Sequence, residues 1–202
     1  HLAIGDHAAV AGGQIGSFPL ADAEATTHIL GNRVAIDSAV ADLGFARLTA
    51  TGDVGLEASA PLALRVHASV PDLATALHRL VPRKNVDVSG SLESDVVLGG
   101  SFAQPRIAAG FDLEKPRYEQ LLVQRIVGNV DGDLHGIRLD SADFILNHGS
   151  AAIAGSLPLL LNPAGVGPPD APISVTADAH NVELAALSPL LEGVDLEWLN
   201  RN

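Results

Sequence analysis

The chain has no cysteine and no methionine in its 202 residues, and aromatic residues make up only 3% of it. The absence of cysteine excludes disulfides, thiolate metal ligands and cysteine nucleophiles, although it says nothing about the compartment. Because 47% of the residues are hydrophobic and so few of them are aromatic, the apolar mass is aliphatic. This composition suits the pleated surface of a β-sheet better than a core centred on aromatic rings.

Positive charge and long apolar runs are also scarce. Twelve basic residues stand against 24 acidic ones, and the net charge of −12 repels nucleic-acid phosphates and anionic membrane surfaces. We therefore expect no nucleic-acid partner. The longest apolar runs, such as residues 157–161, are far shorter than the roughly 20 residues of a membrane-spanning helix. Because the chain starts at His1 and shows no signal-peptide pattern, we expect it to be a piece of a longer protein or a processed chain.

Residues that commonly carry chemistry are present, but their spacing matches no catalytic or metal-binding pattern. The eight histidines are scattered and form none of the close pairs that are typical of zinc sites. Asp131 and Asp133 flank a glycine, yet the later ligands of a calcium loop are missing. The chain has neither a phosphate-binding loop nor a Gly-x-Ser-x-Gly elbow. We therefore expect no enzyme activity, no metal site and no cofactor.

Alternation of apolar and polar residues recurs along the chain and predicts an all-β fold. In Leu62–Val70 every second residue is apolar, and Pro71 ends the alternation. Leucines at i, i+4 and i+7 within Leu73–Leu80 then predict one short helix, with Asp72 near its start. The same patterns predict strands over residues 34–40, 46–58, 86–98, 107–114, from about 124 onward, 134–139 and 144–146. We expect Val34, Ile36, Ser38 and Val40 on one face of their strand, and a bulge near Asp143.

Two parts of the chain are similar to later parts. Residues 61–80 match residues 172–191 at an offset of 111, and the sequence IDSA at 36–39 matches LDSA at 139–142 at an offset of 103. The difference of eight residues falls in the Pro/Gly-rich loop 162–171. We predict one continuous repeat fragment, with approximate copies at 34–98 and 137–202 joined by residues 99–136. Copies stacked edge to edge would form one long apolar surface.

Periodicity alone leaves two alternatives for this surface, because an ordinary closed core and an open trough need the same alternation. The few aromatics available to fill a core and the short helical stretches available to cover a sheet favour a trough that meets an apolar ligand. The residues predicted to line it are Val34, Ile36, Val54, Leu56, Leu62, Leu64, Val66, Val96, Leu98, Ile107, Phe111, Leu113, Leu157, Leu159, Ile173 and Val175.

The stretches 88–114 and 125–157, followed by NVELAALSPLL at 181–191, resemble the repeat region of TamB-type translocation and assembly proteins, within the wider AsmA-like group. The Gly-Ser-Phe-x-x-Pro run at 100–105 is among the best parts of this similarity. The resemblance implies a β-taco fold, which is a long U-shaped sheet of repeated strand modules with one or two short helices and an apolar concave face.

The resemblance also implies a function and a location. We expect a fragment of a periplasm-spanning, bridge-like carrier that moves phospholipid acyl chains between the inner and outer membranes, anchored to the inner membrane through a segment outside this sequence. Expected partners are a phospholipid or another acyl-chain ligand, and an outer-membrane assembly β-barrel protein. The alternative is a structural or chaperone module for outer-membrane protein assembly, which offers exposed strand edges to its clients.

Overall fold

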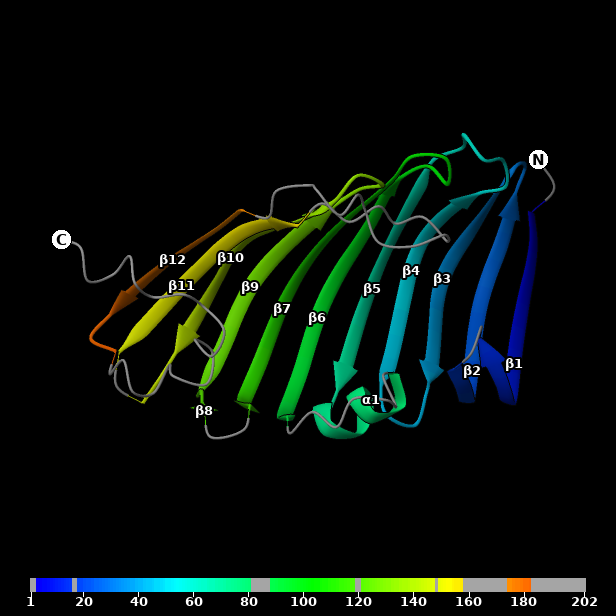
Figure 1. Ribbon diagram of the computed structural model, residues 1–202. Helices are drawn as coiled ribbons and strands as arrows, with labels where there is room; N and C mark the ends of the chain where they lie inside the picture. Colours follow the sequence, from blue (N-terminus) through cyan, green and yellow to red (C-terminus); the bar gives the residue numbers. More distant parts are fainter. Residues whose placement is uncertain are drawn as a thin grey trace.

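The computed structural model describes residues 3–15, 18–80, 88–118, 121–147, 149–157 and 174–182. Nearly all of them belong to one antiparallel β-sheet, and one short helix lies beside it (Figure 1). The strands are β1 (Ala3–Ile15), β2 (Phe18–Leu30), β3 (Arg33–Asp42), β4 (Arg47–Gly55), β5 (Leu62–Val70), β6 (Val88–Gly100), β7 (Pro105–Tyr118), β8 (Leu121–Leu122), β9 (Arg125–Gly132), β10 (Ile137–Ile145), β11 (Ser150–Leu157) and β12 (Ser174–His180), and the helix is α1 (Leu73–Leu80).

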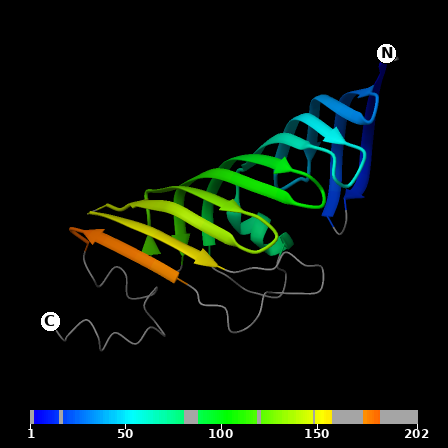
Figure 2. The same cartoon turned by 90° about the horizontal axis from the view of Figure 1, so that it is seen from above.

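The sheet is a meander, in which strands that follow one another in the chain also lie side by side. The order of pairing runs β1-β2-β3-β4-β5-β6-β7-β9-β10-β11-β12, and the short β8 pairs with β7 beside this path. The sheet is curved and remains a single open layer (Figure 2). In the described part of the chain, β1 and β12 each pair along one edge only. The prediction of an all-β fold with one short helix is confirmed.

The helix forms where the sequence predicted it. The Asp72 carboxylate accepts hydrogen bonds from the backbone N–H of Ala74 at 3.0 Å and from the Thr75 hydroxyl at 2.6 Å, so it caps the first turn. These bonds, chiefly the one from the Thr75 hydroxyl, lower the pKa of Asp72. Ala76 is buried against Phe45 and Val70, which fastens α1 at one end of the sheet beside β4, β5 and β6 (Figure 1).

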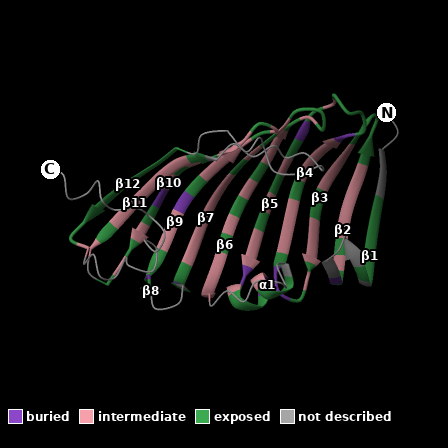
Figure 3. Ribbon diagram, viewed as in Figure 1, coloured by how far each residue is buried: buried purple, intermediate pink, exposed green. Residues whose placement is uncertain are grey.

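Burial is slight throughout the described residues. Most strand residues are half-buried or exposed, and buried positions are isolated (Figure 3). No described side chain is fully enclosed. A single sheet layer that faces no second layer among the described residues produces this pattern. The buried apolar residues are Leu20, Phe45, Ala46, Leu62, Val70, Ala76, Val123 and Ala142.

The two copies of the short repeat form the same backbone irregularity. In β3 the register shifts between Ile36 and Ala39, which pair with Gly52 and Ala50 of β4. In β10 it shifts between Leu139 and Ala142, which pair with Gly155 and Ile153 of β11. Each residue of the second bulge lies 103 positions after its counterpart in the first. The repeated IDSA and LDSA sequences therefore mark β-bulges.

The equivalence of registers extends beyond these bulges. The pair Ala9–Glu24 joins β1 to β2, and the pair 103 positions later, Asp112–Val127, joins β7 to β9. Arg47–Ser69 between β4 and β5 corresponds to Ser150–His180 between β11 and β12, at the offsets of 103 and 111 found in the sequence. The five strands β1–β5 thus have the same pairing as β7 and β9–β12. The division into copies at 34–98 and 137–202 itself stays a prediction.

The bulge in β3 corrects one expectation, and the bulge in β10 bears on another. Because an extra residue in a strand reverses the faces beyond it, Val40 pairs with Thr49 on the face opposite to Val34, and Ala39 and Ala41 take the place predicted for Ser38 and Val40. The segments predicted at 134–139 and 144–146 belong to one strand, β10, and the bulge expected near Asp143 is confirmed at 139–142. Alternation alone could not locate the inserted residue.

A substitution at Gly52, which lies opposite the first bulge, tests whether the backbone at the bulge requires a glycine. The φ of Gly52 is +131°, and a Cβ there would lie 2.0 Å from the carbonyl oxygen of Ala63. We expect Gly52→Ala to lower the free energy of unfolding by about 2 kcal/mol or more, because both the backbone conformation and the space are unsuitable. Urea unfolding monitored by circular dichroism measures this change.

Gly99→Ala is the matched control, because Gly99 is also in a strand and a Cβ there meets nothing within 4 Å. It should unfold at the same urea concentration as the parent or at a slightly higher one. Equal effects of the two substitutions would contradict the assignment of strain to Gly52.

Candidate functional site

The apolar side chains of the sheet stand in rows that cross the strands. Residues directly opposite in an antiparallel pair point to the same face, so the registers connect side chains from strand to strand. One row passes through Leu64 and another through Val66. The first contains Ile36, Gly52, Leu64, Leu98, Ile107, Gly132, Ile137 and Leu157, and the second contains Ala39, Ala50, Val66, Val96, Ala109, Val130, Leu139, Gly155 and Val175.

Two further rows lie toward the end of the sheet where α1 packs. One contains Ala41, Leu48, Ala68, Ser94, Phe111, Gly128, Ala142, Ile153 and Ala177, and the other contains Val70, Leu92, Leu113, Ile126, Phe144, Ala151 and Ala179. We call the surface made by these four rows the apolar face. It extends without interruption from β3 to β12. Its one hydroxyl in these rows, on Ser94, donates a hydrogen bond to the carbonyl of Gly110 at 2.9 Å.

Most residues predicted from the sequence as lining residues fall on this face. Ile36, Leu64, Val66, Val96, Leu98, Ile107, Phe111, Leu113, Leu157 and Val175 occupy the four rows, and Val34, Val54 and Leu62 form a short row beside them on β3, β4 and β5. Leu56 lies beyond the end of β4 with 59% of its surface exposed, outside the paired rows. Leu159 and Ile173 lie outside the described residues. A lining role for these residues stays a prediction.

Several residues of the apolar face were not among those predicted. They lie mainly on β9, β10 and β11. The sequence of residues 115–127 fits a helix or a loop leading into a strand from about residue 124, and the bulge in β10 interrupts the alternation. The alternation of Ile126, Gly128, Val130 and Gly132 was the signal that could have placed these residues of β9 on the apolar face. The unpredicted large side chains are Leu48, Val70, Leu92, Ile126, Val130, Ile137, Leu139, Phe144 and Ile153.

The surface changes at its ends. Toward β1 the first row becomes polar, because it continues from Ile36 through Thr27 to Asp6. The second row stays apolar there, from Ala39 through Ala25 to Ala8. At the other border α1 packs through Leu73 and Ala76 onto Val70 and Leu92, at one end of β5 and β6. The helix therefore closes one end of a few strands and leaves the rows through Leu64 and Val66 uncovered by any described element.

The opposite face is polar and is joined across the strands by ion pairs. Arg125 of β9 donates two hydrogen bonds to Asp112 of β7, including one from Nε at 2.8 Å. Arg138 of β10 pairs with Asp131 of β9 at 2.8 Å. These contacts lower the pKa of Asp112 and Asp131, in each case chiefly through the hydrogen bond from the arginine. They are half-exposed pairs that align neighbouring strands and contribute little each.

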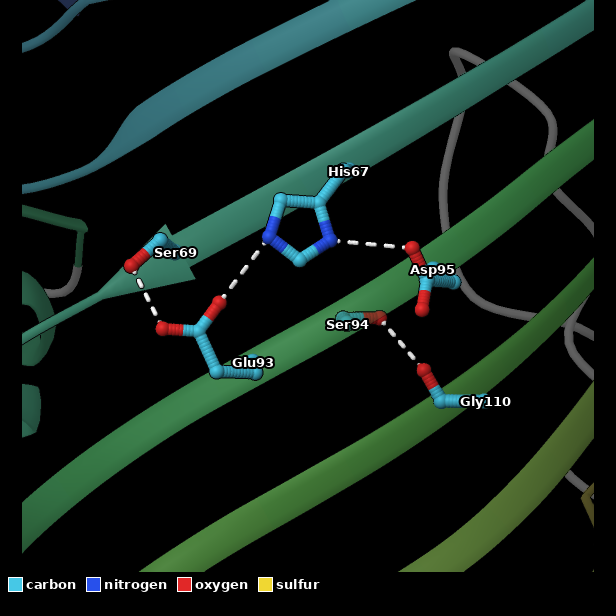
Figure 4. A network of polar contacts seen from close by, with 6 residues as sticks. All are labelled: His67, Ser69, Glu93, Ser94, Asp95 and Gly110. Atoms are coloured by element: carbon cyan, nitrogen blue, oxygen red, sulfur yellow. Dashed lines mark hydrogen bonds and ion pairs between the residues drawn. The ribbon is translucent and has the colours of Figure 1, made fainter.

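His67 lies at the centre of a further polar cluster (Figure 4). Its Nδ1 is 2.9 Å from Asp95 and its Nε2 is 3.1 Å from Glu93, which also accepts a hydrogen bond from Ser69 at 2.6 Å. The hydrogen bond to Asp95 is the main cause that raises the pKa of His67 above its ordinary value of 6.5. With 47% of its side chain exposed and both nitrogens engaged by carboxylates, His67 joins β5 to β6.

Two open hollows also lie on the sheet, of about 770 Å³ and about 290 Å³, and both include Val97. Most of the side chains that line them belong to the polar face, among them Arg65, His67, Asp131 and Arg138. Three of their carboxylates pair with a neighbouring lining residue: Asp131 with Arg138, Asp95 with His67 and Asp133 with His135. The apolar face is the better candidate site because its chemistry is uniform over many strands.

Across the described segments, no group of three His, Asp, Glu or Cys side chains is placed to hold a metal ion. Among the helices that the structure describes, none has the length and hydropathy to cross a membrane. No protein-family model matches the chain, and no curated protein or solved structure matches it. The family resemblance inferred from the sequence therefore stays an inference.

The raised pKa of His67 predicts a pH-dependent stability. A raised folded-state pKa means that the stabilisation is fully present below pH 6.5 and is lost as the pH rises through the folded-state value. We expect His67→Gln to lower the melting temperature more at a pH of about 5.5 than at about 8.5, because only protonated His67 attracts both carboxylates. His78→Gln on α1 is the control, and an equal loss at both pH values would contradict the prediction.

Proposed function

We propose that the apolar face binds the acyl chains of a phospholipid or a related amphiphile, and that the chain is part of a conduit along which such lipids move. The observation that carries this proposal is the unbroken set of apolar rows from β3 to β12 with no second layer packed on it in the described structure. Monomeric proteins rarely leave so continuous an apolar surface without a ligand or partner.

The side chains of the face suit a flexible hydrocarbon chain. They are mostly Ala, Val, Leu, Ile and Gly, which offer neither a deep pocket nor a polar group that would select one position. Each buried methylene contributes about 0.8 kcal/mol, so a chain of many methylenes is held by the sum of small contacts. Because adjacent strands lie about 4.8 Å apart and present similar side chains, a ligand can shift by one strand at little cost.

The shape of the sheet is part of the proposal. We infer a U-shaped trough of the β-taco kind, with the apolar face inside the trough and the polar face exposed to water. On β6, Val96 and Leu98 are half-buried whereas Glu93 and Asp95 are exposed, which supports this orientation. The resemblance to TamB-type and AsmA-like proteins supports a periplasmic location, with contact to both membranes through regions outside this sequence.

Adjacent valines on β6 test the proposal with matched substitutions. Val96 lies on the apolar face and Val97 on the polar face, where 49% of it is exposed. We expect Val96→Asp to weaken the binding of a fluorescent stearate analogue by about tenfold or more, because it places an unpaired charge among the acyl contacts. Val97→Asp should bind the probe as the parent does.

Leu64→Asp on β5 and Val175→Asp on β12 extend this test along the face. Both should reduce bound lipid, measured by solvent extraction and mass spectrometry of the purified chain, while circular dichroism still reports the sheet. Absence of lipid from the parent chain, or equal loss in the Val96 and Val97 variants, would contradict the proposal.

A second function is supported by the edges of β1 and β12 that pair with no strand in the part of the chain that the structure describes. A structural or chaperone module could use them to pair with strands of outer-membrane proteins by β-augmentation. This function predicts crosslinks from edge positions to such a client and normal behaviour of the Val96→Asp variant. The two functions are therefore distinguished by the same set of variants.

A further inference from the structure

Among the described residues, β1 and β12 each have one edge without a paired strand, and these two free edges are equivalent to the two edges that β6 occupies inside the sheet. β7, the counterpart of β1 at the offset of 103, pairs with β6 on the side that corresponds to the free edge of β1. β5, the counterpart of β12 at the offset of 111, pairs with β6 on the side that corresponds to the free edge of β12. Inside the sheet, β6 therefore pairs with the counterparts of both free edges.

We propose that each free edge binds an extended strand with the alternation of β6, in the register that β6 itself uses. The partner is a strand with apolar residues at every second position and polar ones between them. The backbone of such a strand pairs with the edge, and its apolar side chains extend each row of the apolar face by one residue. The register is specified because a slip of one residue would turn every side chain of the added strand to the other face.

The pairs that β6 makes inside the sheet predict which residues of β1 and β12 lie opposite each residue of an added strand. Ser94 pairs with Phe111 of β7 and Ala68 of β5, so the residue in its place is opposite Ala8 of β1 or Ala179 of β12. Asp95 pairs with Gly110 and His67, so the residue in its place is opposite His7 of β1 or Asp178 of β12.

Charge makes the two edges different. On β1 a carboxylate in the place of Asp95 would be opposite His7 and would share this imidazole with Glu24, which lies 3.4 Å from it, as Asp95 shares His67 with Glu93 within the sheet. On β12 the same carboxylate would be opposite Asp178, and like charges at directly opposite positions are unfavourable. The β1 edge therefore prefers an acidic residue at this position and the β12 edge a basic one. On the apolar side of β1, Asp6 stands in the place of Ala109, so a polar residue opposite it improves the fit there.

The absence of cysteine from the chain allows a direct test by disulfide formation. A synthetic peptide with the sequence of residues 88–100 and Ser94→Cys is incubated with the full chain carrying one cysteine. We expect it to crosslink to the Ala8→Cys chain at least about tenfold faster than to Ala9→Cys, whose side chain lies on the other face. On β12 we expect Ala179→Cys to react faster than His180→Cys by a similar factor.

A second peptide that also carries Asp95→Lys tests the charge rule. It should crosslink about threefold more slowly to Ala8→Cys and about threefold faster to Ala179→Cys than the first peptide. Equal rates at neighbouring cysteines, or a charge effect of the same sign at both edges, would overturn the proposal. Lipid binding by the parent chain is measured independently, so this result does not depend on the function proposed above.

Discussion

The backbone ladder between neighbouring strands is the interaction on which the rest of this structure depends. In the described part, a strand has the adjacent strands as its main partners, and only β4, β5 and β6 have a helix beside them. With so few buried side chains, the apolar contacts are those between neighbours on one face. Stability in such a sheet is local and accumulates strand by strand, as in other repeat architectures.

This ladder also explains why both faces have the chemistry they do. Register places like with like across many strands, so the alternation within one strand becomes rows of apolar groups on one face and ion pairs on the other. Asp112 with Arg125 and Asp131 with Arg138 join neighbouring strands without involving the apolar face. A face that is free of charge over many strands is what a hydrocarbon ligand requires, and it arises here from the same register that holds the sheet together.

The bulges at Ile36–Ala39 and Leu139–Ala142 allow β3 and β10 to contribute apolar residues to the apolar face along their whole length. Each bulge inserts one residue midway along its strand, so the side chains after it point to the opposite face from the one that simple alternation predicts. Residues before and after the bulge therefore lie on the same apolar face as the residues with which they pair. The glycine opposite each bulge, Gly52 or Gly155, leaves room where a Cβ would approach a carbonyl oxygen of the next strand. Because the bulge and the glycine opposite it recur at a constant offset, the two sets of five strands have the same structure.

The all-β class, the helix at Leu73–Leu80, most strands and part of the apolar face could be predicted from the sequence alone, because alternation and capping are local properties of neighbouring residues. The face of Val40, the unity of β10 and the membership of Ile126 and Phe144 in the apolar face could not. These features depend on which residue stands opposite which, and an inserted residue changes that without changing the local pattern. Whether the apolar residues would enclose one another was likewise decided only by the tertiary structure, because a closed core and an open single layer have the same alternation.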